Sequence, residues 1–419
     1  MHYREEIPVD HGVDNTFALM TEGYMYIPNR RRRFNSNIFS TRLMGGQKVI
    51  CIAGEEATRL FYDNDKFQRQ GAAPKRVLKT LFGKNGVQTL DGYAHKQRKA
   101  LYRMLLEPRR MKQLLDITYD QWDIAIEQWK GKDQVQLLHE AEKIMCRIVC
   151  RWTEVPLWAN ELERRAHDLG SMIDAFGAIG PRHWRGRLAR KRSEAWIRQV
   201  ITRVRSGSLQ VREDSLLHAF AWACDTEGML LNPQSAAVEL LNVLRPTVAV
   251  GRFVTYGAVA FHQFPETKKK FQTNDDAYRH MFIQEVRRYY PFGPFLGARV
   301  RRPFVWKGHA FKQGTLVLLD VYGAHHDPHI WKEPDIFKPE RFRDWNSSPF
   351  DFLPQGGGDY MSGHRCPGEW VTTEVMKASL DALANQMAYD VPRQDLSYSL
   401  VRIPSLPKSR FIMENIRRK

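Results

Sequence analysis

One cysteine of this chain lies in a glycine-rich loop directly before a long apolar helical pattern. The loop runs from residue 355 to residue 369 in the order Gln-Gly-Gly-Gly-Asp-Tyr-Met-Ser-Gly-His-Arg-Cys-Pro-Gly-Glu, which places its sulfur at Cys366. Glycines let a backbone approach a flat macrocycle, so a haem iron could take this thiolate, and His364 and Arg365 could meet a haem propionate or the charge of the sulfur. A small buried cysteine in a turn explains the loop alone equally well.

A second motif favours the haem interpretation. Glu285 and Arg288 share one face of an amphipathic run at 280–290, and Arg341 follows in Pro-Glu-Arg-Phe shortly before the cysteine loop. An acid and a base three residues apart usually mark only a solvated helix face. In this order, ahead of a cysteine loop, the set resembles the cytochrome P450 superfamily, in which that glutamate and arginine lock the segment beneath the haem. The resemblance implies a mainly α, single-domain cytochrome P450 fold with minor β sheet over residues 1–419, and haem b held by an axial thiolate from Cys366.

The cysteine loop departs from the usual superfamily form at two positions. Asp359 stands where a phenylalanine is expected, and Ser362 stands where a glycine is expected. The sequence Gly-His-Arg-Cys-Pro-Gly-Glu-Trp is more similar to the cysteine loop of one subgroup, the bacterial fatty-acid peroxygenases. These enzymes hydroxylate or decarboxylate fatty acids with hydrogen peroxide.

A long apolar helix is predicted over residues 235–261, yet it carries Arg245 followed by Pro246 near its middle. Proline has no amide hydrogen, so the carbonyl of Asn242 loses its helical partner. A buried guanidinium is costly unless a carboxylate pairs with it. A salt bridge to an acid of the protein is the plain explanation, but Glu239 is six positions away and faces elsewhere.

The same stretch supports the subgroup resemblance. Typical oxygen-activating cytochromes P450 carry an acid followed by a threonine here, whereas this chain has Arg245, Pro246 and Thr247. In the peroxygenases the arginine binds the substrate carboxylate. Arg245 would hold a fatty acid through this carboxylate. The bound carboxylate would also take a proton from hydrogen peroxide and return it to the departing oxygen. Arg252, two turns further along nearly the same face, is the rival anchor.

The resemblance assigns roles to further residues. Arg69, His95 and Lys99 match positions that hold haem propionates, and taken alone they would be ordinary surface residues. Gln88 matches a position that is Gln or His in relatives, where His is associated with more decarboxylation, so Gln88 favours hydroxylation. An apolar pocket and channel is implied by Leu81, Phe82, Ile173, Phe176, Phe292 and Pro294, although aromatic clusters are usually core.

Periodicity gives a mainly helical chain with a little sheet. A hairpin is predicted at 36–53 around Gly45-Gly46, and strands at 299–306 and 316–319. Helical patterns cover 94–106, 110–129, 136–152, 160–177, 189–206 and 367–388. No linker, repeat or composition break divides the 419 residues, so we expect one domain.

Charge and cysteine content limit the partners and the compartment. The net charge of +17 suggests nucleic acid, but the basic residues are dispersed without a nucleic-acid motif, so we expect no nucleic-acid partner. The densest cluster, Arg30 to Arg33, predicts an exposed turn. The five cysteines show no metal-binding pattern, and we expect Cys146 and Cys150 to be packing residues. Such a set is typical of a protein in a reducing compartment. No stretch is long enough to span a membrane, so we expect a soluble, cytoplasmic protein.

Three functions fit these observations, in order of preference. The first is α- or β-hydroxylation of long-chain fatty acids by hydrogen peroxide, with some decarboxylation to terminal alkenes and no dedicated redox partner. The second is a conventional monooxygenase that needs a ferredoxin or flavin reductase, and the third is a non-catalytic haem or fatty-acid binding protein. Arg245 and Pro246 argue against the second, and the full set of peroxygenase residues argues against the third.

Overall fold

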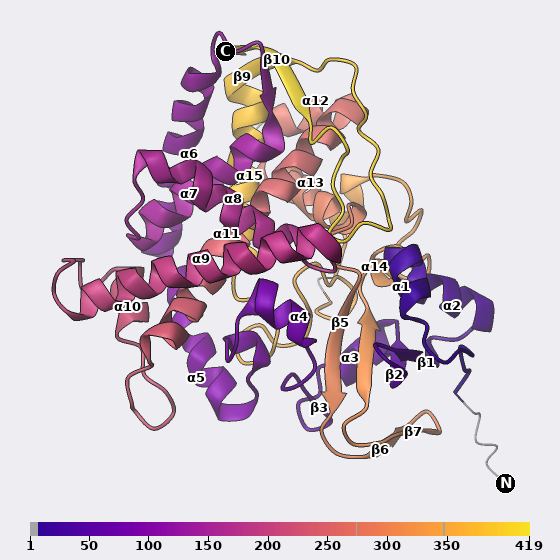
Figure 1. Cartoon of the computed structure of the whole chain (residues 1–419). Coiled ribbons are helices and arrows are strands. Elements are labelled where there is room, and N and C mark those ends of the chain that lie inside the picture. The colour runs from indigo at the N-terminus through magenta and orange to yellow at the C-terminus, as the bar shows by residue number, and fades with distance from the viewer. Residues whose placement is uncertain (1–6, 274, 347) are drawn as a thin grey trace.

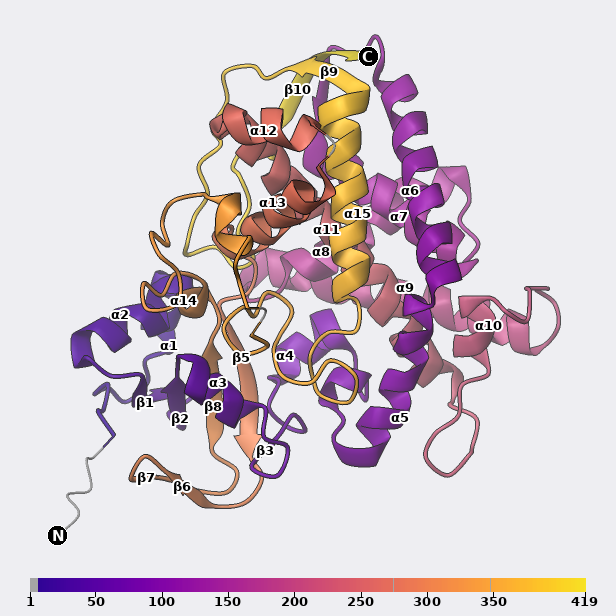
Figure 2. The ribbon, with the colours of Figure 1, turned by 180° about the vertical axis from the view of Figure 1, so that it is seen from behind.

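The computed structural model describes residues 7–273, 275–346 and 348–419, and a large helical part adjoins a smaller sheet (Figure 1). The sheet and the N-terminal helices α1 (Thr16–Glu22) and α2 (Tyr26–Phe34) lie on one side of the molecule, and most of the later helices fill the other (Figure 2). The expectation of a mainly α chain with minor sheet is confirmed.

The main sheet has five strands in the order β1-β2-β8-β5-β3. The predicted hairpin is present as β1 (Ile38–Leu43) and β2 (Gln47–Ile52), and β2 runs parallel to β8 (Leu316–Asp320). The strand predicted at 299–306 is two strands, because β5 ends at Val300 and β6 begins at Phe304. The remaining strands are β3 (Phe67–Gln68), β4 (Gln134–Gln136), β5 (Phe295–Val300), β6 (Phe304–Trp306), β7 (His309–Phe311), β9 (Met387–Asp390) and β10 (Ile412–Arg418).

The helices follow the predicted pattern closely except at their ends. The long ones are α5 (Gly92–Arg103), α6 (Pro108–Trp129), α7 (Leu137–Thr153), α8 (Leu162–Asp174), α9 (Gly180–Arg205), α11 (Pro233–Gln263), α13 (Asp276–Tyr289) and α15 (Glu369–Asp381). The short ones are α3 (Glu55–Phe61), α4 (Lys75–Val77), α10 (Leu216–Ala221), α12 (Pro265–Gln272) and α14 (Tyr322–His325). Single turns are η1 (Gly23–Met25), η2 (Leu78–Phe82), η3 (Val87–Thr89), η4 (Met104–Leu106), η5 (Ala159–Glu161), η6 (Pro339–Phe342) and η7 (Ala382–Gln386).

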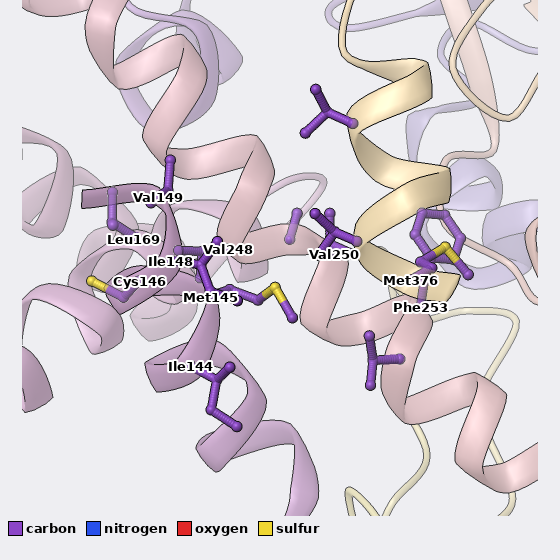
Figure 3. Close-up of a cluster of buried hydrophobic side chains, with 14 of the residues drawn as sticks. Ile144, Met145, Cys146, Ile148, Val149, Leu169, Val248, Val250, Phe253 and Met376 are labelled. Carbon is purple, nitrogen blue, oxygen red and sulfur yellow. The ribbon is translucent and has the colours of Figure 1, made fainter. Parts of the chain in front are cut away.

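Helix α11 runs through the centre of the helical part. Its N-terminus is capped by Asn232, whose side chain accepts a hydrogen bond from the Ser235 amide at 2.8 Å, and Pro233 occupies the first turn. The helix continues through Pro246 to Gln263 and is buried along most of its length. Figure 3 shows its apolar side chains, such as Val248 and Phe253, among those of α7, α8 and α15. Because these apolar side chains are packed against other helices, only the remaining residues of α11 can contact a ligand.

The dense basic cluster at 30–33 is not an exposed turn. It lies in α2, and Arg30 is buried, with its guanidinium 2.7 Å from both Asp10 and Glu22. Arg31 pairs with Asp327 at 2.8 Å. The prediction was wrong because most of the acids that neutralise this cluster, such as Asp10 and Asp327, come from other segments, which the composition of the cluster does not indicate. Cys146 and Cys150 are free and buried in the helical core, as expected of packing residues.

Candidate active site

The cysteine loop lies at the N-terminal end of α15, beside α5 (Figure 2). The Cys366 amide donates to the Gln355 carbonyl at 3.0 Å, which closes the loop on itself. Burial raises the pKa of the Cys366 thiol, and the Gly368 amide, Lys99 and Arg287 act in the opposite direction. Binding to a metal deprotonates a cysteine, and the hydrogen bond from the Gly368 amide and the positive charges of Lys99 and Arg287 would stabilise the resulting thiolate.

The loop glycines are required by close neighbours on the protein side. Gly356 and Gly358 have positive φ angles of 88° and 77°, which other residues rarely adopt. A Cβ atom at Gly356 would stand 2.9 Å from the Tyr62 hydroxyl, and one at Gly357 would stand 2.4 Å from the Pro349 carbonyl. The described contacts therefore explain these glycines by packing within the protein, in addition to any need to approach a macrocycle.

The two positions that depart from the superfamily pattern contact each other. The Asp359 carboxylate accepts hydrogen bonds from the Ser362 amide at 2.5 Å and from its hydroxyl at 2.6 Å. These bonds hold the pKa of Asp359 below its usual value. The exceptional residues thus form one turn of the loop, which the sequence did not predict.

A group of basic side chains faces this loop from two other segments. The ring of His95, on α5, contacts the His364 ring at a tilt of 30° with centroids 4.0 Å apart, and burial lowers the pKa of His95 to about 3. The guanidinium of Arg69 lies over the Phe61 ring at 4.4 Å, and no carboxylate is within ion-pair distance of it among the described residues. Asp91 is the acid of the group, 3.4 Å from His364. Burial favours a higher pKa for Asp91, but His364 and the amides of Arg69 and Gln70 lower it to about 2.

Lys99 contacts the loop backbone directly. Its ammonium group donates to the Gly363 carbonyl at 2.5 Å and to the Arg365 carbonyl at 2.8 Å. Burial lowers the pKa of Lys99 to about 8. Lys99 therefore braces the cysteine loop, a contact that sequence reasoning did not find. The other predicted loop cation, Arg365, is paired with Glu369 at 2.7 Å.

The predicted motif of Glu285, Arg288 and Arg341 is a buried ion cluster. Both guanidinium nitrogens Nε and Nη2 of Arg288 donate to the Glu285 carboxylate at 2.8 Å, and Arg341 Nε lies 3.1 Å from the same carboxylate. Sequence reasoning missed the neighbouring Arg287, which is buried and contacts Glu369 and Gln355, both at 2.6 Å. This second pair ties α13 to the start of α15, next to the cysteine.

Arg245 differs from every other buried arginine that the structure describes. Six arginines are buried, and five of them have a carboxylate within 4.0 Å: Arg30, Arg190, Arg252, Arg287 and Arg288. No carboxylate of the described residues is within that distance of Arg245, which is only 7% exposed. Burial lowers the pKa of Arg245 to about 9, and Arg190 acts in the same direction. An uncompensated buried guanidinium is a strong binding site for an anion.

Acids of the protein lie beside Arg252 but not beside Arg245 among the described residues. Glu239 does not pair with Arg245, because it bonds to Arg98 at 2.5 Å and to the Tyr102 hydroxyl. Arg252 lies 3.6 Å from Asp174 and 3.7 Å from Glu142, so acids of the protein already compensate its charge. Thr247 donates its hydroxyl hydrogen to the Val243 carbonyl at 2.9 Å and has no acidic neighbour in the chain.

Asn242 connects Arg245 to Gln88. Arg245 Nη2 donates to Oδ1 of Asn242 at 3.4 Å, and Nδ2 of Asn242 donates to Oε1 of Gln88 at 3.2 Å. Because α11 and η3 are far apart in the sequence, only the fold brings these three side chains together. No local pattern in the sequence marks Asn242 beyond its place one turn before Arg245.

The predicted pocket residues come from three segments. Leu81 and Phe82 lie in η2, Ile173 and Phe176 at the end of α8 and just beyond it, and Phe292 and Pro294 in the turn before β5. Ile173 is buried, and Phe292 stacks on Phe253 of α11 with centroids 5.1 Å apart. Arg190 of α9 supports the first segment by donating to the Leu81 carbonyl at 2.8 Å.

These residues fit a haem with one cysteine ligand. A single thiol stands on a short loop beside Arg69, His95 and Lys99, none of which has a carboxylate within ion-pair distance among the described residues, so all three could meet propionates. Within the described ranges, no group of three or more His, Cys, Asp or Glu side chains could hold a metal ion by itself. None of the helices described is long and apolar enough to cross a membrane.

Comparisons with known proteins agree with this geometry. The family model described as Cytochrome P450 matches residues 273–387. A putative cytochrome P450 139 of Mycobacterium bovis is 23% identical, over 84% of this chain and 88% of that protein. The structure of cytochrome P450EX alpha (CYP152N1) with myristic acid is 45% identical, with a TM-score of 0.95 and 99% of both chains covered. Ligand-free cytochrome P450 OleT is 37% identical, with a TM-score of 0.96 and the same coverage.

Proposed function

This chain belongs to the CYP152 fatty-acid peroxygenases within the cytochrome P450 superfamily, and we propose that it hydroxylates long-chain fatty acids at the α and β carbons with hydrogen peroxide. Oxidative decarboxylation to terminal alkenes is a minor reaction in this proposal. Its relatives were solved with myristic acid and with arachidonic acid, which supports the class of substrate.

The observation that carries the proposal is the buried Arg245 without a carboxylate partner. A fatty-acid carboxylate would supply the missing negative charge and would be held by charge-assisted hydrogen bonds. When the carboxylate is bound by Arg245, the α and β carbons are the carbons nearest to that arginine. The rest of the alkyl chain would then contact the apolar pocket segments. Arg252 is less suited to this role because Asp174 and Glu142 are already beside it.

Bound through Cys366, haem b would supply the iron centre that activates peroxide. The chain would hold it through the thiolate of Cys366, with Arg69, His95 and Lys99 meeting its propionates and His364 and Arg365 completing the basic edge. The ion cluster of Glu285, Arg288 and Arg341 would stabilise the segment that precedes the cysteine loop. In this arrangement Lys99 has two tasks, because its ammonium group also braces the loop carbonyls.

Proton transfer is assigned to the bound carboxylate. No acidic residue of the chain adjoins Thr247, so the protein offers no general acid at the position where other superfamily members have one. A carboxylate fixed by Arg245 can accept a proton from peroxide and return it to the departing oxygen. The substrate therefore completes the catalytic site.

The test is turnover of myristic acid by the purified haem-loaded protein with hydrogen peroxide and no reductase. We expect 2- and 3-hydroxymyristic acid by mass spectrometry, and no product from methyl myristate, which has the same chain without a charge. Product that forms only with NADPH and surrogate redox proteins, in the presence of catalase, would make the chain a conventional monooxygenase. Binding of haem and fatty acid without product under either condition would favour a carrier.

A further inference from the structure

The first half of α9 exposes large apolar side chains on one face. Trp184 and Leu188, four residues apart, are each 57% exposed, and Ile179 just before the helix is 53% exposed. Single exposed apolar residues are normal on protein surfaces. Here three of them fall within ten residues, and two of the three share one helical face, which is the kind of local concentration that marks an interaction surface.

The chain around this patch has no acidic residue. Between Asp174 and Glu194 there are six arginines and lysines: Arg182, Arg185, Arg187, Arg190, Lys191 and Arg192. A second such stretch lies between Asp65 and Asp91, with Lys66, Arg69, Lys75, Arg76, Lys79 and Lys84. The two stretches adjoin in space, because Arg76 donates to the Ala178 carbonyl and η2 packs against α9. Helix α4, which leads directly into η2, lies next to α9 in Figure 1.

Several of these cations have no carboxylate partner among the residues that the structure describes. Arg185 and Lys191 are exposed on the same side of α9 as Leu188, and no carboxylate of the described residues is within ion-pair distance of either. The same holds for the exposed Lys75 and Lys79 of the neighbouring segment. We call Ile179, Trp184, Arg185, Leu188 and Lys191, with Lys75 and Lys79, the α9 face.

We propose that the α9 face docks on the surface of an anionic lipid bilayer. Tryptophan and leucine side chains enter the boundary between headgroups and acyl chains, and flanking lysines and arginines are attracted to anionic headgroups. Nucleic acid would satisfy the charges but would leave the exposed Leu188 and Ile179 without a function. Docking of this kind needs no helix that crosses the membrane.

The position of the α9 face suggests what docking achieves, and this step rests on the proposed function. Leu81 and Phe82 lie in η2, which packs against α9, and Ile173 and Phe176 lie at the end of α8 and in the connection that leads to α9. These are the residues assigned to the substrate pocket. A protein docked by the α9 face would therefore present its pocket to the lipid phase, where long-chain fatty acids accumulate.

The experiment is sedimentation of the haem-loaded protein with sucrose-loaded vesicles, without fatty acid or peroxide. We expect binding to vesicles that contain phosphatidylglycerol, weak binding to pure phosphatidylcholine, and loss of binding in high salt. Arg185→Gln with Lys191→Gln should lower the partition coefficient about 25-fold, at about fivefold for each charge. Trp184→Ser with Leu188→Ser should lower it by at least about 10-fold.

Matched controls separate the α9 face from general charge and exposure. Trp158→Ser removes a tryptophan that is 70% exposed elsewhere, and Arg42→Gln with Lys48→Gln removes two exposed cations from the β1–β2 pair. These controls should bind as the wild type does. Equal losses in the controls, equal binding to both vesicle types, or tighter binding to a DNA duplex that is unaffected by Trp184→Ser with Leu188→Ser would overturn the proposal.

A solution assay keeps this proposal separate from the proposed function. Peroxide turnover of myristic acid in buffer without vesicles should stay within about twofold of wild type in all these variants, since none of the substituted residues lies in the catalytic site. Vesicle binding by an inactive wild type would contradict the peroxygenase function and leave the docking proposal standing.

Discussion

Asn242 and Arg245 lie one turn apart on α11, and Arg245 Nη2 donates to the Asn242 side-chain oxygen at 3.4 Å. The amide nitrogen of the same side chain donates to Gln88 at 3.2 Å. One neutral amide therefore orients both the proposed carboxylate anchor and the residue proposed to set the product ratio. Because the amide has no charge, Arg245 keeps its full positive charge for a ligand.

This relationship predicts the effect of a charge at position 242. Asn242→Asp would place a carboxylate beside Arg245 that competes with the substrate, so the dissociation constant for myristic acid should rise by about 10- to 100-fold. Asn242→Leu, which removes the hydrogen bonds without adding charge, should have a smaller effect. Titration of haem absorbance with myristic acid measures both, and equal affinities in the wild type and Asn242→Asp would contradict the model.

Gln88 is expected to set product partition. Gln88→His should raise the fraction of terminal alkene relative to hydroxy acid, because the side chain lies beside the α and β carbons in the proposed binding mode. Gas chromatography of products at matched turnover gives the ratio. An unchanged ratio would place Gln88 outside the reaction zone.

Glu285 should be the most costly carboxylate to neutralise. Glu285→Gln leaves the buried Arg288 and the largely buried Arg341 without their shared counterion, which typically costs about 3–5 kcal/mol of unfolding free energy. Urea unfolding followed by circular dichroism and haem absorbance measures the loss. As a comparison, Glu266→Gln, in the exposed pair with Lys269, should leave the midpoint almost unchanged.

Cys366 is expected to be the axial ligand. The ferrous carbon monoxide complex of the wild type should absorb near the wavelength diagnostic of a thiolate ligand, and Cys366→Ala should lose that band. Cys146→Ala is a suitable control because Cys146 is buried in the helical core. Persistence of the band in Cys366→Ala would assign the ligand to another residue.

The sequence predicted the elements whose signal is local. Apolar periodicity located α5 to α8 and α11, and the Gly45-Gly46 turn located the β1–β2 pair. The start of α9 was predicted nine residues late, because its first turns are exposed and carry an irregular series of basic and apolar residues. That irregularity is the same feature that distinguishes the α9 face.

The site was predicted in parts. Cys366, Arg245 and the Glu285 motif could be identified from the sequence because their residue types or spacing contrast with the neighbouring residues. Contacts across the fold were not visible: the Asn242 bond to Gln88, the Arg287 pair with Glu369 and the Lys99 bonds to the loop each join segments that are far apart in the sequence. Such partners depend on tertiary packing, which no local pattern encodes.

The central claim is that Arg245 anchors the substrate carboxylate, and one comparison of two arginines tests it most directly. Acetate should act as a decoy acid in the wild type and permit peroxide oxidation of guaiacol, a substrate without a carboxylate. Arg245→Ala should retain haem but lose both this rescue and fatty-acid turnover by orders of magnitude, whereas Arg252→Ala should keep the rescue. Rescue that survives Arg245→Ala and disappears with Arg252→Ala would contradict the account and move the anchor to Arg252.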